Sequence, residues 1–348
     1  MYDALPGLCL VLGGCQANMF LLELIMAGSP NTMYALTFLQ YVIVALFTLP
    51  LILAPGSPSG GFRVLSLRLR RRRLLAWHKL LVGVSAWVMS VSANLVFNMY
   101  ISIPVHATFR SLPLLMNMLV GFLFMKKRYT VSQVMCGSTI TLGLVLLTVE
   151  KSRRTSGASP NSGGGSQPSH EYFWWVCGIA ILFFTTVLST ALSLLQEHMY
   201  DTARRREKEL EAGNKRSDAS VEEALAMAAP APSPMWAEAL FFSHAVGIPL
   251  FFLQPHRLLV EFASVSPDDY VNFLLNAITQ FMCVMGVYVV NSQTSALTLV
   301  LILTLRKLGT FTLSVIYFEH WHHFTATEWL AMFAALGASA LYPFLPKA

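Results

Sequence analysis

Apolar runs of about 20 residues recur along the whole chain, and they constrain its fold more than any other feature. A helix of that length spans the roughly 30 Å hydrocarbon core of a bilayer and satisfies its own backbone polar groups there. Hydrophobic residues make up 55% of the 348 residues and charged residues only 12%, which is too few charges for an ordinary soluble domain. The sequence therefore predicts an all-α polytopic membrane protein.

The apolar runs predict ten transmembrane helices. The expected helices are Leu5–Met26, Met33–Leu53, Leu80–Ile101, Val105–Met125, Val131–Val149, Phe173–Leu195, Met235–Leu253, Tyr270–Val290, Ser295–Phe318 and Trp329–Leu345. The first run lacks a preceding basic segment and has Asp3 near its start, so we expect it to remain as a helix rather than to be cleaved as a signal peptide.

Lysine and arginine are distributed unequally around the predicted helices. If both termini are cytosolic, most of the 24 basic residues lie on the cytosolic side, as the positive-inside rule requires. The arginine-rich segment Arg68–Arg73 could suggest a nucleic-acid ligand, but beside a membrane span it is better explained as a topology anchor that touches anionic lipid. We expect cytosolic termini, and a lipid bilayer rather than a nucleic acid as partner.

The cysteines and histidines form no recognisable metal-binding pattern. All five cysteines fall inside predicted helices, so we expect small core residues rather than disulfides or zinc ligands; they are Cys9, Cys15, Cys136, Cys177 and Cys283. The tract His320–His323 has histidines at a spacing that can bind a metal, but no cysteine or paired carboxylate completes the ligand set. We expect no metal and no other cofactor.

Two polar segments divide the chain. Residues 151–172, rich in Ser, Gly and Pro, are expected to form a flexible linker on the lumenal side. Residues 1–150 and 173–348 then hold five helices each. The second half also carries a highly charged and then Ala/Pro-rich stretch at about 198–234, which we expect to be a mobile, partly helical cytosolic insertion.

The two halves repeat the same order of features. Arg110 in the first half, and Arg306 with Lys307 in the second, lie inside apolar runs. Each is followed by a helix start with the spacing of a capping box, at Thr130–Gln133 and Thr325–Glu328. Because five spans is an odd number, the second half would enter the membrane from the opposite side. This predicts an inverted repeat of 5+5 helices, which in secondary transporters places the substrate near the midplane.

The three buried cations indicate an anionic substrate. A charge at the centre of a bilayer costs from about 3 to 10 kcal/mol, so such residues persist where they face a wet cavity or a counter-charge. The alternative for Arg110 is a purely structural ion pair with Glu23, the one acidic residue deep in a predicted span. One of Arg306 and Lys307 could likewise pair with an acid, because the two point about 100° apart around a helix.

Several segments resemble the nucleotide-sugar transporters of the drug/metabolite transporter superfamily. They are GGCQANMFLLEL, NMYISIPVHATFRS, FMKKRY, YFWW, EALFFSH, LNAITQF and SALTLVLILTLRKLGTFTLSVIYF. The branch that carries UDP-N-acetylglucosamine and UDP-xylose is the most similar. The resemblance implies residence in the Golgi or endoplasmic reticulum and exchange of a cytosolic nucleotide sugar for lumenal nucleoside monophosphate (UMP), and it is compatible with a homodimer.

The resemblance also identifies candidate substrate-binding residues. Lys307 matches the lysine of the family motif, and its compact ammonium suits a phosphate oxygen. The further candidates could bind phosphate, uracil or sugar; they are Arg306, Arg110, His244, Glu238, Asn94, Asn98, Tyr288, Gln280 and Glu23. The alternative for the uncharged candidates is hydrogen bonding between helices, worth about 1 kcal/mol each. Phe242 and Ser243 replace a Tyr-Asn pair of close relatives, so this chain lacks the phenol and the amide that those relatives have beside His244.

Two other functions compete with this interpretation. A transporter for another phosphorylated metabolite would keep the cations and need no base-reading groups. A membrane-embedded transferase would need a paired acid and base near the midplane. Glu23 and Glu238 are the candidate carboxylates and lie on distant helices without a recognisable spacing, so we disfavour an enzyme.

Overall fold

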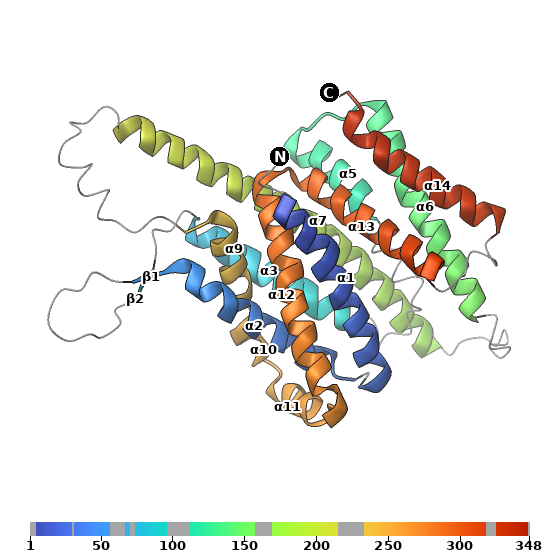
Figure 1. Cartoon of the computed structure of the whole chain (residues 1–348), viewed down its shortest axis with the longest axis horizontal. Coiled ribbons are helices and arrows are strands. Elements are labelled where there is room, and N and C mark those ends of the chain that lie inside the picture. The colour runs from blue at the N-terminus through green and yellow to red at the C-terminus, as the bar shows by residue number, and fades with distance from the viewer. Residues whose placement is uncertain are drawn as a thin grey trace. The chain divides into compact units, whose positions relative to one another are not determined.

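The structure is a computed structural model that describes residues 5–29, 31–55, 67–69, 74–95, 112–156, 169–214, 233–317 and 325–346. Helices account for most of these residues (Figure 1). The chain divides into two compact units. Unit 1 comprises Met1–Val88 and Leu195–Thr294, and unit 2 comprises Met89–Leu194 and Ser295–Ala348. Each unit therefore combines segments from both predicted halves. The inverted repeat remains a prediction. The two units are defined by which residues contact each other, whereas a repeat is defined by helices that correspond in sequence order.

Unit 1 is built from helices of both of its chain segments. They are α1 (Leu5–Gly28), α2 (Met33–Ile52), the start of α3 (Ala76–Leu95), the end of α7 (Ser169–Asn214), α9 (Met235–Ala245), α10 (Ile248–Phe251), α11 (Pro255–Ala263), the 3-10 turn η3 (Pro267–Asp269) and α12 (Tyr270–Gln293). Two short strands, β1 (Leu53–Pro55) and β2 (Leu67–Leu69), pair antiparallel after α2. The sequence predicted no strand, so this pair is a small exception to the all-α expectation.

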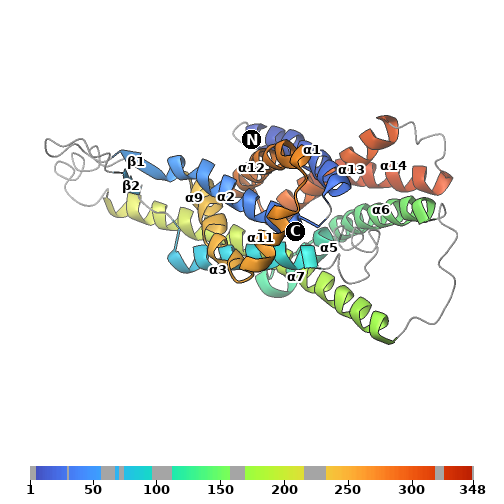
Figure 2. The same ribbon diagram turned by 90° about the horizontal axis from the view of Figure 1, so that it is seen from below.

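Helices α1 and α12 lie side by side in both views (Figures 1 and 2). Glycines permit the close approach: a Cβ on Gly14 would lie 2.9 Å from the backbone nitrogen of Cys283, and one on Gly286 would lie 2.7 Å from the carbonyl oxygen of Gly7. Cys15 and Cys283 form a disulfide at this contact. Our expectation that no cysteine pairs was therefore wrong, because a separation of 268 residues carries no sequence signal for the contact.

Unit 2 packs around the last helix of each predicted half. Its elements are the end of α3, α5 (Pro113–Met125), α6 (Val131–Ser156), the start of α7, α13 (Ala296–Tyr317), α14 (Ala326–Leu341) and the 3-10 turn η5 (Tyr342–Phe344). Helices α6 and α14 run side by side (Figures 1 and 2), and a Cβ on Gly143 would lie 2.8 Å from the Cβ of Ala335. Leu114, Ile140 and Leu301 contribute to the buried core that joins α5, α6, α13 and α14.

Both predicted capping boxes are present at helix starts in unit 2. Before α6, the Thr130 amide donates to the Gln133 side chain over 3.1 Å, and the Gln133 amide donates to the Thr130 hydroxyl over 3.3 Å. Before α14, Thr325 and Glu328 make the same reciprocal pair, at 2.8 and 3.4 Å. These bonds satisfy backbone donors that a helix leaves free at its first turn.

Several described helices are suited to a bilayer. By length and composition four of them can cross a membrane, or five if the bent pair Met235–Phe251 and Pro255–Ala263 counts as one span. Shorter apolar helices occur in α5, α6 and α14. These helices support a multi-pass membrane protein, and the ten-span arrangement remains a prediction.

The predicted helix Met235–Leu253 is interrupted. Helix α9 ends at Ala245, and Gly247 bonds to His244 in a tighter turn before α10 begins. Pro249 has no amide hydrogen to donate to the carbonyl oxygen of Ala245, so a continuous helix would lose a bond there. The axis then bends by 95° into α11, which lies between two of the predicted spans.

Two helix boundaries also differ from prediction. Helix α7 continues past Leu195 to Asn214, which makes it 46 residues long. Its final turns are helical and carry many charged residues. The whole helix is therefore longer than the roughly 20 residues that span a bilayer. Helix α3 begins at Ala76, four residues before the expected Leu80, and this places Lys79 in its first turn.

Candidate functional site

The predicted site residues fall into three groups. Four have described side chains in unit 1, namely Glu238 and His244 on α9 and Gln280 and Tyr288 on α12. Arg306 and Lys307 lie on α13 in unit 2 and are partly exposed. Glu23 lies on α1 and Asn94 on α3, but their side chains are outside the described part; Asn98 and Arg110 lie outside the described residues altogether.

Tyr288 is buried in a hydrogen-bonded chain that joins α7 to α12. The Gln196 amide nitrogen donates to the Tyr288 hydroxyl over 3.1 Å, and the Asn291 amide nitrogen donates to the Gln196 carbonyl over 2.6 Å. Tyr288 and Asn291 are one helical turn apart, so a single glutamine can reach both. Next to them, the buried Tyr200 hydroxyl and the Asn291 carbonyl oxygen have no protein partner. The cluster thus retains a donor and an acceptor for further bonds.

His244 on α9 is linked to this cluster through the neighbouring Ser243. Its Nδ1 lies 2.9 Å from the Leu240 carbonyl oxygen, and since a carbonyl only accepts, Nδ1 carries the hydrogen. In the neutral ring Nε2 is then left as an acceptor. The Tyr41 ring lies 4.7 Å from the imidazole, and the Ser243 hydroxyl interacts with both His244 and Tyr288. Ser243 therefore connects two of the predicted site residues.

Glu238 is engaged in a buried ion pair with Lys79 of α3. Its second carboxylate oxygen accepts from the Leu74 amide over 3.4 Å, and the Lys79 ammonium also lies 4.4 Å from the centre of the Phe242 ring. Both charged side chains are almost fully buried, at 6% and 2% exposed. A carboxylate held in this way fixes α3 against α9 and is poorly placed to bind a sugar hydroxyl at the same time.

A second polar cluster in unit 1 is saturated with hydrogen bonds. Asn18 and Asn276 each donate to the other's carbonyl oxygen over 3.0 Å, and Gln40 donates to the Asn276 side chain over 2.7 Å. These three residues clamp α1, α2 and α12 together. Gln280 lies one turn beyond Asn276 and is partly exposed. We assign these three residues a structural role, because both polar atoms of the Asn276 side chain are already bonded within the protein.

Helix α13 carries the two candidate cations Arg306 and Lys307. Val300, Leu301 and Thr304 are buried against the core, and Thr304 donates to the Val300 carbonyl over 2.8 Å. Lys307 follows Val300 by seven residues, which places it on nearly the same face of the helix. Arg306 lies about 100° away. On a regular helix these two side chains therefore leave the axis in different directions.

Sequence reasoning missed the polar residues that connect the predicted ones. Gln196, Asn291 and Ser243 hold Tyr288 and His244 in place, and Lys79 holds Glu238. Amide side chains inside apolar runs were the available signal for Gln196 and Asn291. Lys79 was overlooked because the start of α3 was placed after it. Within the described residues no group of three or more His, Cys, Asp or Glu could hold a metal ion, and His320–His323 lie outside them.

Comparison with known proteins places the chain among transporters. The sequence profile of the UAA transporter family matches residues 3–210 and 229–344. A protein named UDP-N-acetylglucosamine transporter YEA4 from Kluyveromyces lactis is 28% identical, with 97% of this chain and 95% of that protein covered. A UDP-xylose and UDP-N-acetylglucosamine transporter of Danio rerio is 24% identical over 98% and 93%. An endoplasmic reticulum GDP-fucose transporter of Drosophila melanogaster is 26% identical over 97% and 90%.

A solved crystal structure is among those that share the fold. It superposes with a TM-score of 0.55 over 96% of each chain, at 13% sequence identity. At that identity the likeness concerns the fold alone.

Proposed function

Because the chain belongs to the UAA transporter family, we propose that it moves a nucleotide sugar across the membrane of the Golgi or the endoplasmic reticulum. Similar proteins of nearly the same length are named as transporters of such substrates. The family is one of transporters, so the transferase alternative is set aside.

The proposed substrate is UDP-N-acetylglucosamine, UDP-xylose or both, exchanged for UMP. The pair of cations inside the apolar helix α13 is the strongest support, because a nucleotide sugar is anionic at its diphosphate. We assign Lys307 to the phosphate, since it lies beside the packed face of α13 and a point charge can follow a moving group. Arg306 and Arg110 are the further proposed phosphate contacts.

The buried cluster of unit 1 is the proposed reader of the nucleotide. Tyr288 and His244 are positioned by Gln196 and Ser243, and Tyr200 and Asn291 keep polar atoms available. Unpartnered polar atoms in an apolar environment are costly and mark a place where a ligand can supply the missing bonds. Gln280, Asn94, Asn98 and Glu23 remain weaker candidates, and Glu238 would act through Lys79 rather than by direct contact.

We further propose ten spans arranged as an inverted 5+5 repeat, with cytosolic termini and alternating access. Residues 1–150 and 173–348 would be the two repeats. Both have a capping box at the start of the last helix, and these two helices pack together. Substrate at the interface of such repeats is the general arrangement in secondary transporters. Assembly as a homodimer is compatible with this proposal.

A GDP-sugar is the second candidate substrate. The GDP-fucose transporter matches this chain as well as the UDP-sugar transporters do, so sequence similarity does not choose the base. The Phe242-Ser243 pair differs from the Tyr-Asn of the UDP-sugar branch, at a position next to His244 and Tyr288. The base is therefore the main question for experiment.

The experiment is uptake into liposomes that contain the purified full-length protein. Labelled UDP-, GDP- and CMP-sugars are offered to liposomes preloaded with UMP, GMP, CMP or buffer. We expect saturable uptake of UDP-N-acetylglucosamine or UDP-xylose, accelerated by internal UMP. Uptake of a GDP-sugar accelerated by GMP would instead support the second candidate. A folded protein that carries no nucleotide sugar would refute both.

Lys307→Ala tests the assigned cation. We expect at least a hundredfold loss of uptake, because one charge-assisted contact with phosphate contributes about 3 kcal/mol. Lys208→Ala is the matched control, since Lys208 is exposed on the end of α7. Equal uptake by the two variants would remove Lys307 from the site.

A further inference from the structure

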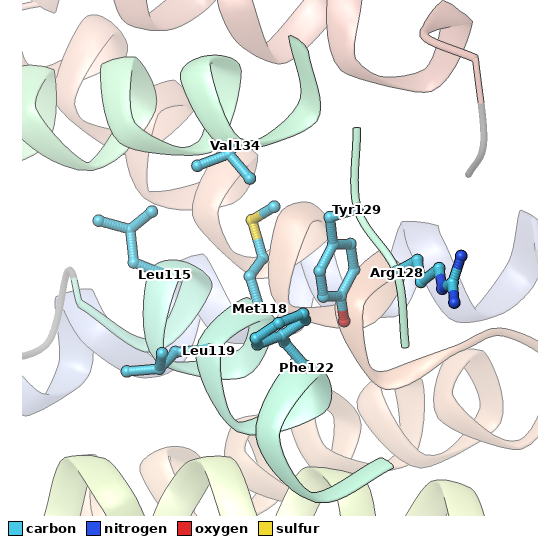
Figure 3. Close-up of a pocket in the computed structure, with 7 residues that line it drawn as sticks. All are labelled: Leu115, Met118, Leu119, Phe122, Arg128, Tyr129 and Val134. Atoms are coloured by element: carbon cyan, nitrogen blue, oxygen red, sulfur yellow. The ribbon is translucent and has the colours of Figure 1, made fainter. Parts of the chain in front are cut away.

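A cavity of about 680 Å³ opens in unit 2 between α5 and α6 (Figure 3). Its walls are largely aliphatic and aromatic, with Leu115, Leu119 and Phe122 on α5 and Val134 on α6. Leu119 and Phe122 are 51% and 58% exposed, so the cavity is an open groove on an apolar helix surface. In a membrane protein such a groove faces hydrocarbon chains.

The polar end of the groove comes from the connection between the two helices. Helix α5 ends at Met125, and the next residue, Lys126, adopts a left-handed backbone conformation with φ of 53°. The chain then turns so that Tyr129 folds back over α5, and a Cβ on Gly121 would come 2.5 Å from its hydroxyl. Arg128 lines the groove beside Tyr129. The capping box at Thr130 then starts α6 and fixes the turn.

The groove is therefore amphiphilic along its length. Figure 3 shows Arg128 at one end, the rings of Tyr129 and Phe122 next to it, and Leu115 and Leu119 at the other end. Arg128 and its two neighbours Lys126 and Lys127 make a run of three positive charges. From Leu112 to Val149 the sequence contains no Asp or Glu, so this stretch of the chain is purely basic in its charged residues.

We propose that this groove binds an anionic membrane phospholipid, with its phosphate at Arg128 and an acyl chain along Leu119 and Leu115. A guanidinium forms two parallel hydrogen bonds with phosphate oxygens, which a diffuse cluster of lysines does not. The apolar wall accepts the chain, and the adjacent rings separate the two ends. Basic residues at the cytosolic end of a span attract anionic lipids in general, but a lined groove beside one arginine makes a specific site.

Lipid retention by the intact protein tests this proposal. The full-length protein is released from nanodiscs that contain equal phosphatidylserine and phosphatidylcholine, and native mass spectrometry counts the lipids that remain bound. We expect a preference for phosphatidylserine. Arg128→Gln should lower that preference about fivefold, since one basic contact with an anionic membrane is worth roughly 1 kcal/mol. Lys126→Gln removes the same charge two residues away and lies outside the groove, so it should change the preference much less.

A second variant tests the apolar part. Val134→Trp fills the groove without changing charge and should lower retention of both lipids, whereas Val131→Trp, at an exposed position outside the groove wall, should not. Thermal unfolding of each variant verifies that it is folded. Equal effects of Arg128→Gln and Lys126→Gln, or no preference for phosphatidylserine, would overturn the proposal. Displacement of the lipid by millimolar inorganic phosphate would also overturn it, because the site would then recognise phosphate alone.

Discussion

At the scale of single residues, Gln196 shows how a polar group is accommodated inside this apolar chain. Its amide nitrogen donates to Tyr288, and its carbonyl accepts from Asn291. Gln196 thereby holds in place both the Tyr288 ring, a proposed contact of the nucleotide, and the Asn291 side chain, whose carbonyl oxygen has no protein partner. Interhelical bonds of this kind usually contribute about 1 kcal/mol, and their value here lies in orientation as much as in stability.

Gln196→Leu should both destabilise the protein and weaken transport. The substitution removes the Gln196 hydrogen bonds of the buried Tyr288 hydroxyl and the Asn291 amide, at a cost of about 1 to 3 kcal/mol. Thermal unfolding in detergent measures the loss, and uptake measures the apparent KM. Thr139→Val is the control, because Thr139 is exposed and bonds only to its own helix. If Gln196→Leu lowers the unfolding temperature but leaves KM unchanged, the residue has a structural role alone.

Breaking the Lys79–Glu238 pair from one side should cost more than removing it. Glu238→Gln leaves a buried ammonium uncompensated, with an expected loss of about 3 to 5 kcal/mol. Lys79→Met combined with Glu238→Gln should recover much of this loss. A double-mutant cycle of unfolding free energies measures the coupling. Additive effects would show that the two charges do not depend on each other.

At the scale of helices, the break after α9 depends on the space beside Gly247. A Cβ there would lie 2.5 Å from Cε1 of Tyr41, the ring that contacts His244. We expect Gly247→Ala to push Tyr41 aside, lower stability by about 1 to 3 kcal/mol and raise the apparent KM. Gly337→Ala is the matched control: nothing lies within 4 Å of its Cβ position, and alanine favours a helix, so stability should rise slightly.

The disulfide between α1 and α12 predicts a simple chemical count. After denaturation without reductant, a maleimide should label the three free cysteines, Cys9, Cys136 and Cys177. After reduction it should label all five. Mass spectrometry of the labelled protein gives both numbers. Five labels without reductant would show that Cys15 and Cys283 are not bonded.

Two helix starts could be predicted from the sequence because their signal lies within a few residues, whereas contacts between distant segments could not. Thr130–Gln133 and Thr325–Glu328 lie within one turn, so the sequence alone reveals their capping boxes. The pairing of Cys15 with Cys283 depends on packing between distant segments. Helix α11 was missed because nine residues are too few for a hydrophobic run to be recognised. The candidate residues on α9 and α12 were identified from their types, but Gln196 and Lys79, which hold two of them, become apparent only in the fold.

At the scale of the whole molecule, the chain passes between the two compact units at three points. They lie within α3 after Val88, within α7 after Leu194, and between α12 and α13 after Thr294. The bond between Gln196 and Asn291 joins residues next to two of these points on the side of unit 1. Of these two residues Asn291 lies near the end of α12, the kind of position at which hinges occur in domain motions.

A crosslink between positions 196 and 291 should therefore be tolerated by transport. If the contact between these positions stays closed throughout the cycle, the double variant Gln196→Cys, Asn291→Cys should still exchange substrate after oxidation. The expected rate is within about threefold of the rate of the same variant in its reduced form. The reduced form is the proper reference because it lacks the same hydrogen bonds. Uptake before and after oxidation gives the ratio. Loss of exchange on oxidation alone would show that the junction opens during the cycle, so that it is a gate.

Helix α7 also offers a practical handle. At 1.5 Å per residue its 46 residues extend about 69 Å, more than twice the thickness of the hydrocarbon core. Its later turns are anchored to unit 1, because Tyr200 and Ala203 are buried and Arg204 donates to the Ser292 carbonyl over 2.6 Å. A small helical protein fused in frame near Asn214 would continue this rod as a fiducial marker. Electron cryomicroscopy of a chain this small, with little mass outside the membrane, could then align particles by the marker.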